Sequence, residues 1–300
     1  MLRLTLLLVA LAAPLRAEPP RVLTDIAPVH SLVASVMSGV ATPDLLLPPG
    51  IAPHDYALRP SDAARIAESD LIFWVGPGLT PWLAEGLATL APDAERIALL
   101  DLSDTPTLPL RRNADFAAAA ADGDRAGGGV DPHAWLDPRI ATVWAMAIAD
   151  ALSAADPGNE ATYRSNAALL DVGLEALSRD LGTLLGPVRG RGYIVPHDAF
   201  QYFETAFDMP ATAAISASDD ADPGPAHLAA LRDRIAAGDI ACLLTGPDTS
   251  PGLVATLAGD ADLPTAATDP EGTRLAPGPD LYPTLLRDLA TGLATCLSGG

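Results

Sequence analysis

Short apolar runs alternate with helical patterns in two separate parts of this 300-residue chain, and one long helical stretch lies between the parts. This alternation is typical of βα units around a parallel sheet. The length and the 49% hydrophobic content allow two domains with a large core. We therefore expect an α/β fold with two lobes, each a mainly parallel four-stranded sheet flanked by helices, joined by one long linking helix. The strand candidates are 21–26, 44–48, 71–76 and 96–100, then 192–196, 209–216, 240–246 and 263–268.

The helical patterns predict the domain boundaries. We expect an N-terminal lobe over 18–156, a linking helix over 157–186 and a C-terminal lobe over 187–300. Residues 103–130 are rich in Ala, Asp, Gly and Pro, which indicates a mobile loop within the first lobe. The predicted helices cover 28–37, 59–70 with Ser61 as its N-cap, 81–90, 139–155, 158–185 and 281–297.

The first 17 residues have the pattern of a secretory signal peptide. Arg3 gives a positive start, and residues 4–13 form an apolar run that is too short to span a bilayer. We expect cleavage after Ala17; a buried N-terminal helix is the alternative. No later apolar segment is long enough to cross a membrane, so we expect a soluble, exported mature protein.

The charge balance bears on the class of partner. The formal net charge is −20 and the chain has no lysine. Without a basic stripe to neutralise phosphates, nucleic acid is excluded as a partner. An acidic surface concentrates small cations, although it also serves solubility alone.

The two cysteines, Cys242 and Cys296, bear on the redox compartment. A small, even number in an exported chain indicates one disulfide, with two buried free thiols as the alternative. Closing a loop of this length would stabilise the fold by roughly 4 kcal/mol.

Histidines are placed where ligands bind in open α/β sheets, beyond the carboxyl ends of strands. His30 and His54 follow the first two strand candidates, His197 follows a strand of the second lobe, and His133 follows the loop. Asp269 comes directly after the last strand candidate.

A metal site between the lobes is one interpretation of these positions. His54, His133, His197 and Asp269 are far apart in sequence, so the site would be assembled from separate loops. Three neutral imidazoles and a carboxylate suit tetrahedral Zn²⁺. For each residue alone, an ordinary hydrogen-bonded loop residue is the alternative, and Asp269 could merely cap a turn.

Four segments together resemble the cluster A-I (cluster 9) metal-binding proteins that feed ABC importers, in particular the ZnuA type of periplasmic zinc-binding protein. The resemblance runs in order through almost the whole mature chain. It implies two α/β lobes joined by one long rigid helix, with the metal between the lobes. The segments are PVHSLVASVM, PHDYALRPSDAARIAESDLIFWVGPGL, DPHAWLDP and HDAFQYFE.

The resemblance also implies roles for residues of this chain. His54, His133 and His197 would be the metal ligands, with Asp269 as a variable or distant fourth partner. His30 matches a histidine of only some members and could be a fourth ligand or lie nearby without binding. Manganese-type relatives have a glutamate where His197 stands. The disulfide would pair Cys242 with Cys296, and Trp135 would pack beneath His133 as part of the core.

One departure from the family concerns the loop before His133. Many zinc members have a histidine-rich acidic loop there, whereas residues 111–130 hold Asp115, Asp122 and Asp124 but no histidine. We therefore do not expect this loop to collect zinc through imidazoles.

These observations predict a monomeric periplasmic solute-binding protein that captures Zn²⁺ and delivers it to the permease of an ABC importer, with a periplasmic metallochaperone as a further partner. A binding protein for manganese, another divalent metal or a metal chelate is the alternative. A zinc-dependent hydrolase is less favoured, since no HExxH or GxSxG motif is present and Glu204 is expected to be solvated.

Overall fold

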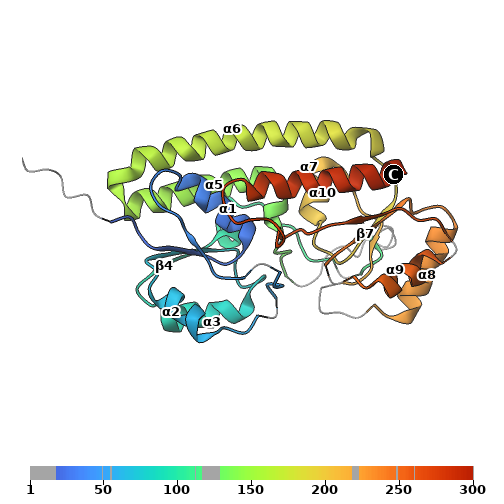
Figure 1. Ribbon diagram of the computed structural model, residues 1–300, viewed down its shortest axis with the longest axis horizontal. Coiled ribbons are helices and arrows are strands. Elements are labelled where there is room, and N and C mark those ends of the chain that lie inside the picture. Colours follow the sequence, from blue (N-terminus) through green and yellow to red (C-terminus); the bar gives the residue numbers. More distant parts are fainter. Residues whose placement is uncertain are drawn as a thin grey trace, which may run out of the picture.

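The computed structural model describes residues 18–48, 50–54, 56–111, 113–116, 129–217, 223–247, 249–259 and 261–299 (Figure 1). The predicted signal peptide, Asp122 and Asp124 lie outside these ranges. The two halves of the described chain each hold a four-stranded sheet, with the orders β2-β1-β3-β4 and β6-β5-β7-β8. All strand pairs are parallel, which confirms the predicted fold class. The strands are β1 Val22–Thr24, β2 Asp44–Leu45, β3 Leu71–Trp74, β4 Glu95–Ala98, β5 Tyr193–Val195, β6 Ala213–Ala214, β7 Cys242–Thr245 and β8 Thr265–Ala267.

The central strands of both sheets are apolar and buried on both faces. All residues of β1, β3 and β5 are buried, as helices cover both faces of a parallel sheet. The edge strands β4 and β8 are partly exposed. The helices are α1 Ala27–Val36, α2 Pro60–Ala67, α3 Pro81–Leu90, α5 Pro138–Ala155, α6 Glu160–Leu185, α7 Gln201–Phe207, α8 Pro225–Ala236, α9 Pro251–Ala258 and α10 Leu281–Ser298, with short 3₁₀ turns η1 Leu99–Asp101, η2 Ala134–Leu136, η3 Pro157–Asn159 and η4 Gly186–Val188.

The start of α2 differs from the sequence prediction. The helix begins at Pro60, and Arg59 rather than Ser61 is the N-cap residue. The Asp62 carboxylate accepts a hydrogen bond of 2.9 Å from the backbone N–H of Arg59. An acidic side chain at the third helical position thus satisfies the exposed N–H of Arg59. Proline fits the first helical position because a backbone N–H there would have no partner within the helix.

Helix α6 runs along both halves of the molecule (Figure 1). Its 26 residues span about 39 Å. It packs on α1 and α5 from the first half and on α10 from the second. One hydrophobic core continues from the first half into the second through these helices. The halves are therefore joined by packed side chains as well as by the chain itself.

Cys242 in β7 and Cys296 in α10 form the predicted disulfide. The bond fixes the C-terminal helix to a central strand of the second sheet. Among the described helices, none is long and apolar enough to cross a membrane.

Candidate metal-binding site

The four main candidate ligands lie in segments that join or follow the strands. His54 is in the loop after β2, His197 in the turn after β5, and Asp269 two residues after the end of β8. His133 immediately precedes η2 and is 4% exposed, whereas the other three are half-buried. The parallel topology thus brings residues that are far apart in sequence to the carboxyl ends of the sheets.

Three imidazoles lie side by side, with His133 in the middle. The His133 ring centroid is 5.9 Å from that of His54 and 5.7 Å from that of His197. In a tetrahedral zinc site, imidazole centroids stand roughly 5 Å apart. In the described ranges, no three His, Cys, Asp or Glu side chains lie close enough together to hold a metal ion. Shifts of about 1 Å would bring both ring pairs to the spacing of zinc ligands.

Asp131 orients the His133 ring. Its Oδ1 atom lies 2.8 Å from His133 Nδ1 and accepts a backbone hydrogen bond from the same residue at 3.0 Å. The carboxylate therefore favours the tautomer with a proton on Nδ1 and a lone pair on Nε2. Nε2 is buried and has no hydrogen-bond partner among the described residues. Asp131 was not among the site residues predicted from the sequence, although a carboxylate two residues before a candidate ligand is a usable signal.

The segment around His133 is also fixed to the second half of the molecule. The Tyr202 hydroxyl donates to the carbonyl of Asp131 at 3.0 Å, and the Trp135 indole donates to the carbonyl of Pro270 at 2.8 Å. The Tyr282 hydroxyl donates to the carbonyl of Trp135 at 2.6 Å. Trp135 is fully buried in the main core, as the sequence predicted. His133 is thus held by residues of both halves.

The loop that carries His54 is anchored close to this residue. The Trp82 indole donates to the carbonyl of Pro53 at 2.7 Å. Tyr56 packs edge-on against Trp82, with ring centroids 5.4 Å apart, and donates its hydroxyl proton to Asp62 at 2.7 Å. A Pro- and Gly-rich loop therefore presents His54 from a fixed base on α2 and α3.

A cleft of about 230 Å³ opens beside His197. Its walls include His197 and Asp269 from the second half and residues 50–52 from the first half. The Asp269 carboxylate accepts hydrogen bonds from the Thr273 hydroxyl at 3.0 Å and from the backbone N–H of Arg274 at 3.1 Å. Asp269 thus lies in the same cleft as His197, but its oxygens are bound within its own turn.

The other two histidines bind backbone carbonyls. His30 Nε2 lies 3.1 Å from the carbonyl oxygen of Pro43, and burial lowers the pKa of His30. No ring contact in the described chain links His30 to His54, His133 or His197. His227 Nε2 lies 2.8 Å from the carbonyl oxygen of Ala214. The structure therefore groups three of the five histidines.

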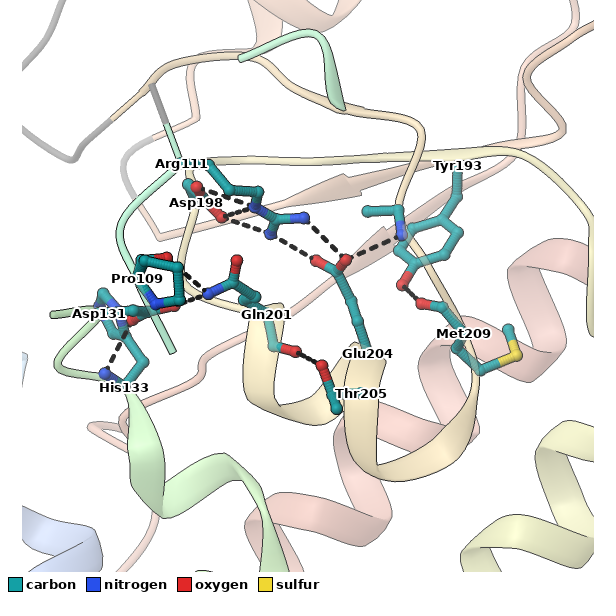
Figure 2. A network of polar contacts seen from close by, with 11 residues as sticks. Pro109, Arg111, Asp131, His133, Tyr193, Asp198, Gln201, Glu204, Thr205 and Met209 are labelled. Atoms are coloured by element: carbon teal, nitrogen blue, oxygen red, sulfur yellow. Dashed lines mark hydrogen bonds and ion pairs between the residues drawn. The ribbon is translucent and has the colours of Figure 1, made fainter. Parts of the chain in front are cut away.

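A buried ionic network, shown in Figure 2, includes Asp198, which directly follows His197 in the chain. Arg111 binds the carboxylate of Asp198 through Nε at 2.9 Å and that of Glu204 through Nη1 at 3.0 Å. Glu204 is 6% exposed, so the prediction that it is solvated was wrong. Its partner lies 93 positions away in sequence. Burial alone would lower the pKa of Arg111, but the bonds to Glu204 and Asp198 outweigh it and raise that pKa, so the guanidinium stays charged.

A family model described as "Zinc-uptake complex component A periplasmic" matches residues 22–296, which include every candidate ligand. The chain belongs to this family. Members of the zinc-uptake family are binding components of uptake systems and not enzymes, which agrees with the sequence prediction.

Two curated relatives in the zinc-uptake family match nearly the whole chain. A high-affinity zinc uptake system protein of Paracoccus denitrificans (strain Pd 1222) is 37% identical over 95% of this chain and 94% of its own length. Its counterpart in Brucella suis biovar 1 (strain 1330) is 35% identical over 95% of this chain and 93% of its own length.

Solved structures share the fold. A crystal structure of ZnuA has a TM-score of 0.77 and 21% identity, covering 93% of this chain and 99% of that one. The Zn(II)-bound ZnuA-like domain of AdcA from Streptococcus pneumoniae has a TM-score of 0.71 and 25% identity, covering 91% and 98%. The two-lobed architecture is therefore that of known zinc-uptake proteins.

Proposed function

We propose that this chain is the periplasmic component of a zinc uptake system, which captures Zn²⁺ between its halves and delivers it to the permease of an ABC importer. The observation that carries the proposal is the group of three imidazoles, His54, His133 and His197, beside an interlobe cleft in a member of the zinc-uptake family. The two curated relatives match this chain over nearly their full length and are named as zinc uptake proteins, which supports the same function.

The chemistry of capture follows from the three imidazoles. A neutral imidazole presents a nitrogen lone pair to Zn²⁺, whereas a protonated one does not. Protons therefore compete with the metal, and zinc affinity falls as the pH is lowered. Asp269, on the wall of the cleft, is our proposed fourth ligand once it exchanges its hydrogen bonds for the metal. His30 is the weaker candidate, because in the described chain its ring makes no contact with His54, His133 or His197.

Zinc is favoured over manganese by the donor set. Imidazole suits Zn²⁺, whereas Mn²⁺ prefers harder oxygen ligands. His197 supplies the third nitrogen at the position where the manganese-type relatives are expected to have a glutamate. We further propose that residues 1–17 are removed as a signal peptide, that the mature protein is a monomer, and that a periplasmic metallochaperone can load it.

A competition titration tests the proposal. The metal-stripped mature protein, residues 18–300, is titrated with Zn²⁺ and separately with Mn²⁺ against a chromophoric chelator. We expect one tightly bound Zn²⁺ per chain and weaker Mn²⁺ binding. His197→Ala should weaken zinc binding by more than about 100-fold, since loss of a ligand exceeds the loss of a supporting contact.

The matched control is His227→Ala, since His227 lies in the same half and, among the described contacts, binds the carbonyl of Ala214 and no candidate ligand. Its zinc affinity should equal that of the wild type. Manganese binding as tight as zinc binding would contradict the zinc assignment. Equal affinities of the His197→Ala and His227→Ala variants would contradict the site.

A further inference from the structure

Arg111 joins two segments that carry different imidazoles. It belongs to the chain that leads from the first sheet toward His133, and its partner Asp198 directly follows His197 in the turn after β5. Arg111 Nε contacts both oxygens of Asp198, at 2.9 and 3.0 Å. Nη1 and Nη2 contact the two oxygens of Glu204 in α7, at 3.0 and 2.9 Å. One guanidinium thus binds two carboxylates, as Figure 2 shows.

Arg111 is also linked rigidly to the segment of His133. Residues 108–110 and 129–131 pair as a short antiparallel ribbon, which we call the interlobe ribbon, and Arg111 directly follows its first segment. Its backbone bonds run from Leu110 N–H to the carbonyl of Gly129 at 3.2 Å and from Asp131 N–H to the carbonyl of Leu108 at 2.9 Å. Because Asp131 holds the His133 ring, the ribbon places Arg111 and His133 on one unit.

Two residues of helix α7 form hydrogen bonds with the interlobe ribbon. Gln201 Nε2 donates to the carbonyl of Pro109 at 3.0 Å and lies 3.3 Å from Asp131 Oδ2. The Tyr202 hydroxyl accepts from the backbone N–H of Leu108 at 2.9 Å. The side chains of Arg111, Asp198 and Glu204 are only 14%, 7% and 6% exposed. Buried charges of this kind keep a fixed geometry, because any movement leaves a charge unpaired.

We propose that Arg111 is a positioning residue for zinc capture: it fixes the turn that carries His197 against the interlobe ribbon that carries His133, so that these two imidazoles stand near ligand spacing before zinc binds. The inference rests on the proposed function and deepens it. His133 and His197 form a preset pair, with centroids 5.7 Å apart, and His54 completes the site from the first half.

Arg111→Lys is the sharpest test. Lysine keeps the positive charge but lacks the planar guanidinium that binds the two carboxylates at once. Arg234→Lys is the matched control. Arg234 ties the same connecting segment to α8 through Asp115 at 3.1 Å, but this pair does not adjoin a candidate ligand. Each full-length mature variant is stripped of metal, its melting temperature is measured in EDTA, and Zn²⁺ is titrated against a chelator. Co²⁺ is then bound as a probe, because its visible absorption reports the geometry of the ligands.

We expect Arg111→Lys to bind zinc about tenfold more weakly than the wild type and to show altered Co²⁺ bands. Losses of this size are typical when a residue that supports a metal ligand is replaced. Arg234→Lys should match the wild type in both zinc affinity and Co²⁺ bands. If Arg111→Lys does not fold, Glu204→Gln replaces it, since it removes one of the two carboxylates without changing the shape; a severalfold loss with altered Co²⁺ bands is then expected.

The inference would be overturned if Arg111→Lys, or Glu204→Gln where that replaces it, kept the zinc affinity and the Co²⁺ bands of the wild type. It would also be overturned if that variant lost no more affinity than Arg234→Lys and its Co²⁺ bands were unchanged, because Arg111 would then have a purely structural role. A wild-type protein that does not bind zinc would instead contradict the proposed function, so the two failures are distinguishable.

Discussion

At the scale of single residues, Asp131 decides which nitrogen of His133 keeps its lone pair. The Asp131 carboxylate is 1% exposed and accepts hydrogen bonds from both the backbone N–H and Nδ1 of His133. Water therefore competes little for the bond, and the ring cannot turn without leaving a buried charge unpaired. A ligand that is oriented beforehand loses less entropy when it binds the metal.

Replacing Asp131 by Asn tests this role. The amide keeps the shape of the side chain but not its charge, so the His133 tautomer is no longer fixed. We expect zinc affinity to fall about 10–100-fold. The readout is a chelator competition, with Asp150→Asn as control because Asp150 is exposed and pairs only with Arg164 in the described contacts. Affinity equal to that of the control would contradict the role of Asp131.

Of the three imidazoles that lie together, His54 and His197 could be expected near the carboxyl ends of the sheets because they follow strands, whereas His133 follows the loop. The partners of Glu204 were not predictable from the sequence. The sequence indicated a solvated helical glutamate, whereas Arg111 neutralises it from 93 positions away. A pairing over such a distance depends on the tertiary fold and leaves no local pattern. Asp131 is the opposite case, since its signal is local.

At the scale of elements, the strands and helices were predicted well because hydrophobic periodicity is a local property. The ends were less certain. Strand β2 is only two residues long, although the apolar run predicted 44–48; the backbone N–H groups of Leu46 and Leu47 still donate to the carbonyls of Thr24 and Asp25, at 2.8 and 3.1 Å. Helix α2 begins one residue before the predicted cap, because Asp62 rather than Ser61 satisfies the exposed backbone N–H.

A buried carboxylate lies just beyond the ends of the paired strands β1 and β3. Asp25 follows β1 and accepts backbone hydrogen bonds from Ile26 at 2.8 Å and Val75 at 2.9 Å. Burial raises the pKa of Asp25 to about 7, and these bonds offset only part of the effect. The native state therefore holds a proton between about pH 4 and 7 that the unfolded state has lost. Over this window the stability contributed by Asp25 falls as the pH rises.

An Asp25→Asn variant isolates this effect in the metal-free protein. Asparagine does not titrate, so its cost is the same at every pH. Between pH 4 and pH 8 the wild type should lose about 4 kcal/mol of unfolding free energy relative to the variant. Urea denaturation in EDTA measures the difference, with the exposed Asp104→Asn as control. A difference that does not change with pH would contradict a titrating Asp25.

The disulfide acts between β7 and α10. Its loop spans 54 positions, so its loss should lower the unfolding free energy by about 4 kcal/mol. Replacing both Cys242 and Cys296 by Ser tests this without leaving a free thiol. Denaturation of the variant should match that of the reduced wild type, and both should fall well below the oxidised protein. An unchanged unfolding midpoint after reduction would contradict the estimate.

At the scale of the whole molecule, the two halves are joined by more than one long helix. A single core passes through α1, α5, α6 and α10. The Ser31 hydroxyl donates to the carbonyl of Pro279 at 3.1 Å and accepts from the backbone N–H of Tyr282 at 3.0 Å. Wide hinge opening would break this core, so we expect zinc to be captured by small shifts of loops and side chains.

The most direct test of the account is to count the imidazoles on the bound metal. X-ray absorption at the zinc edge, on protein loaded with one Zn²⁺, should show three imidazoles and one oxygen at about 2.0–2.2 Å. The His197→Ala variant, loaded at the same ratio, should lose one imidazole, and His227→Ala should lose none. A wild-type shell with at most one imidazole, or an imidazole count that His197→Ala does not change, would contradict a zinc site shared by both halves.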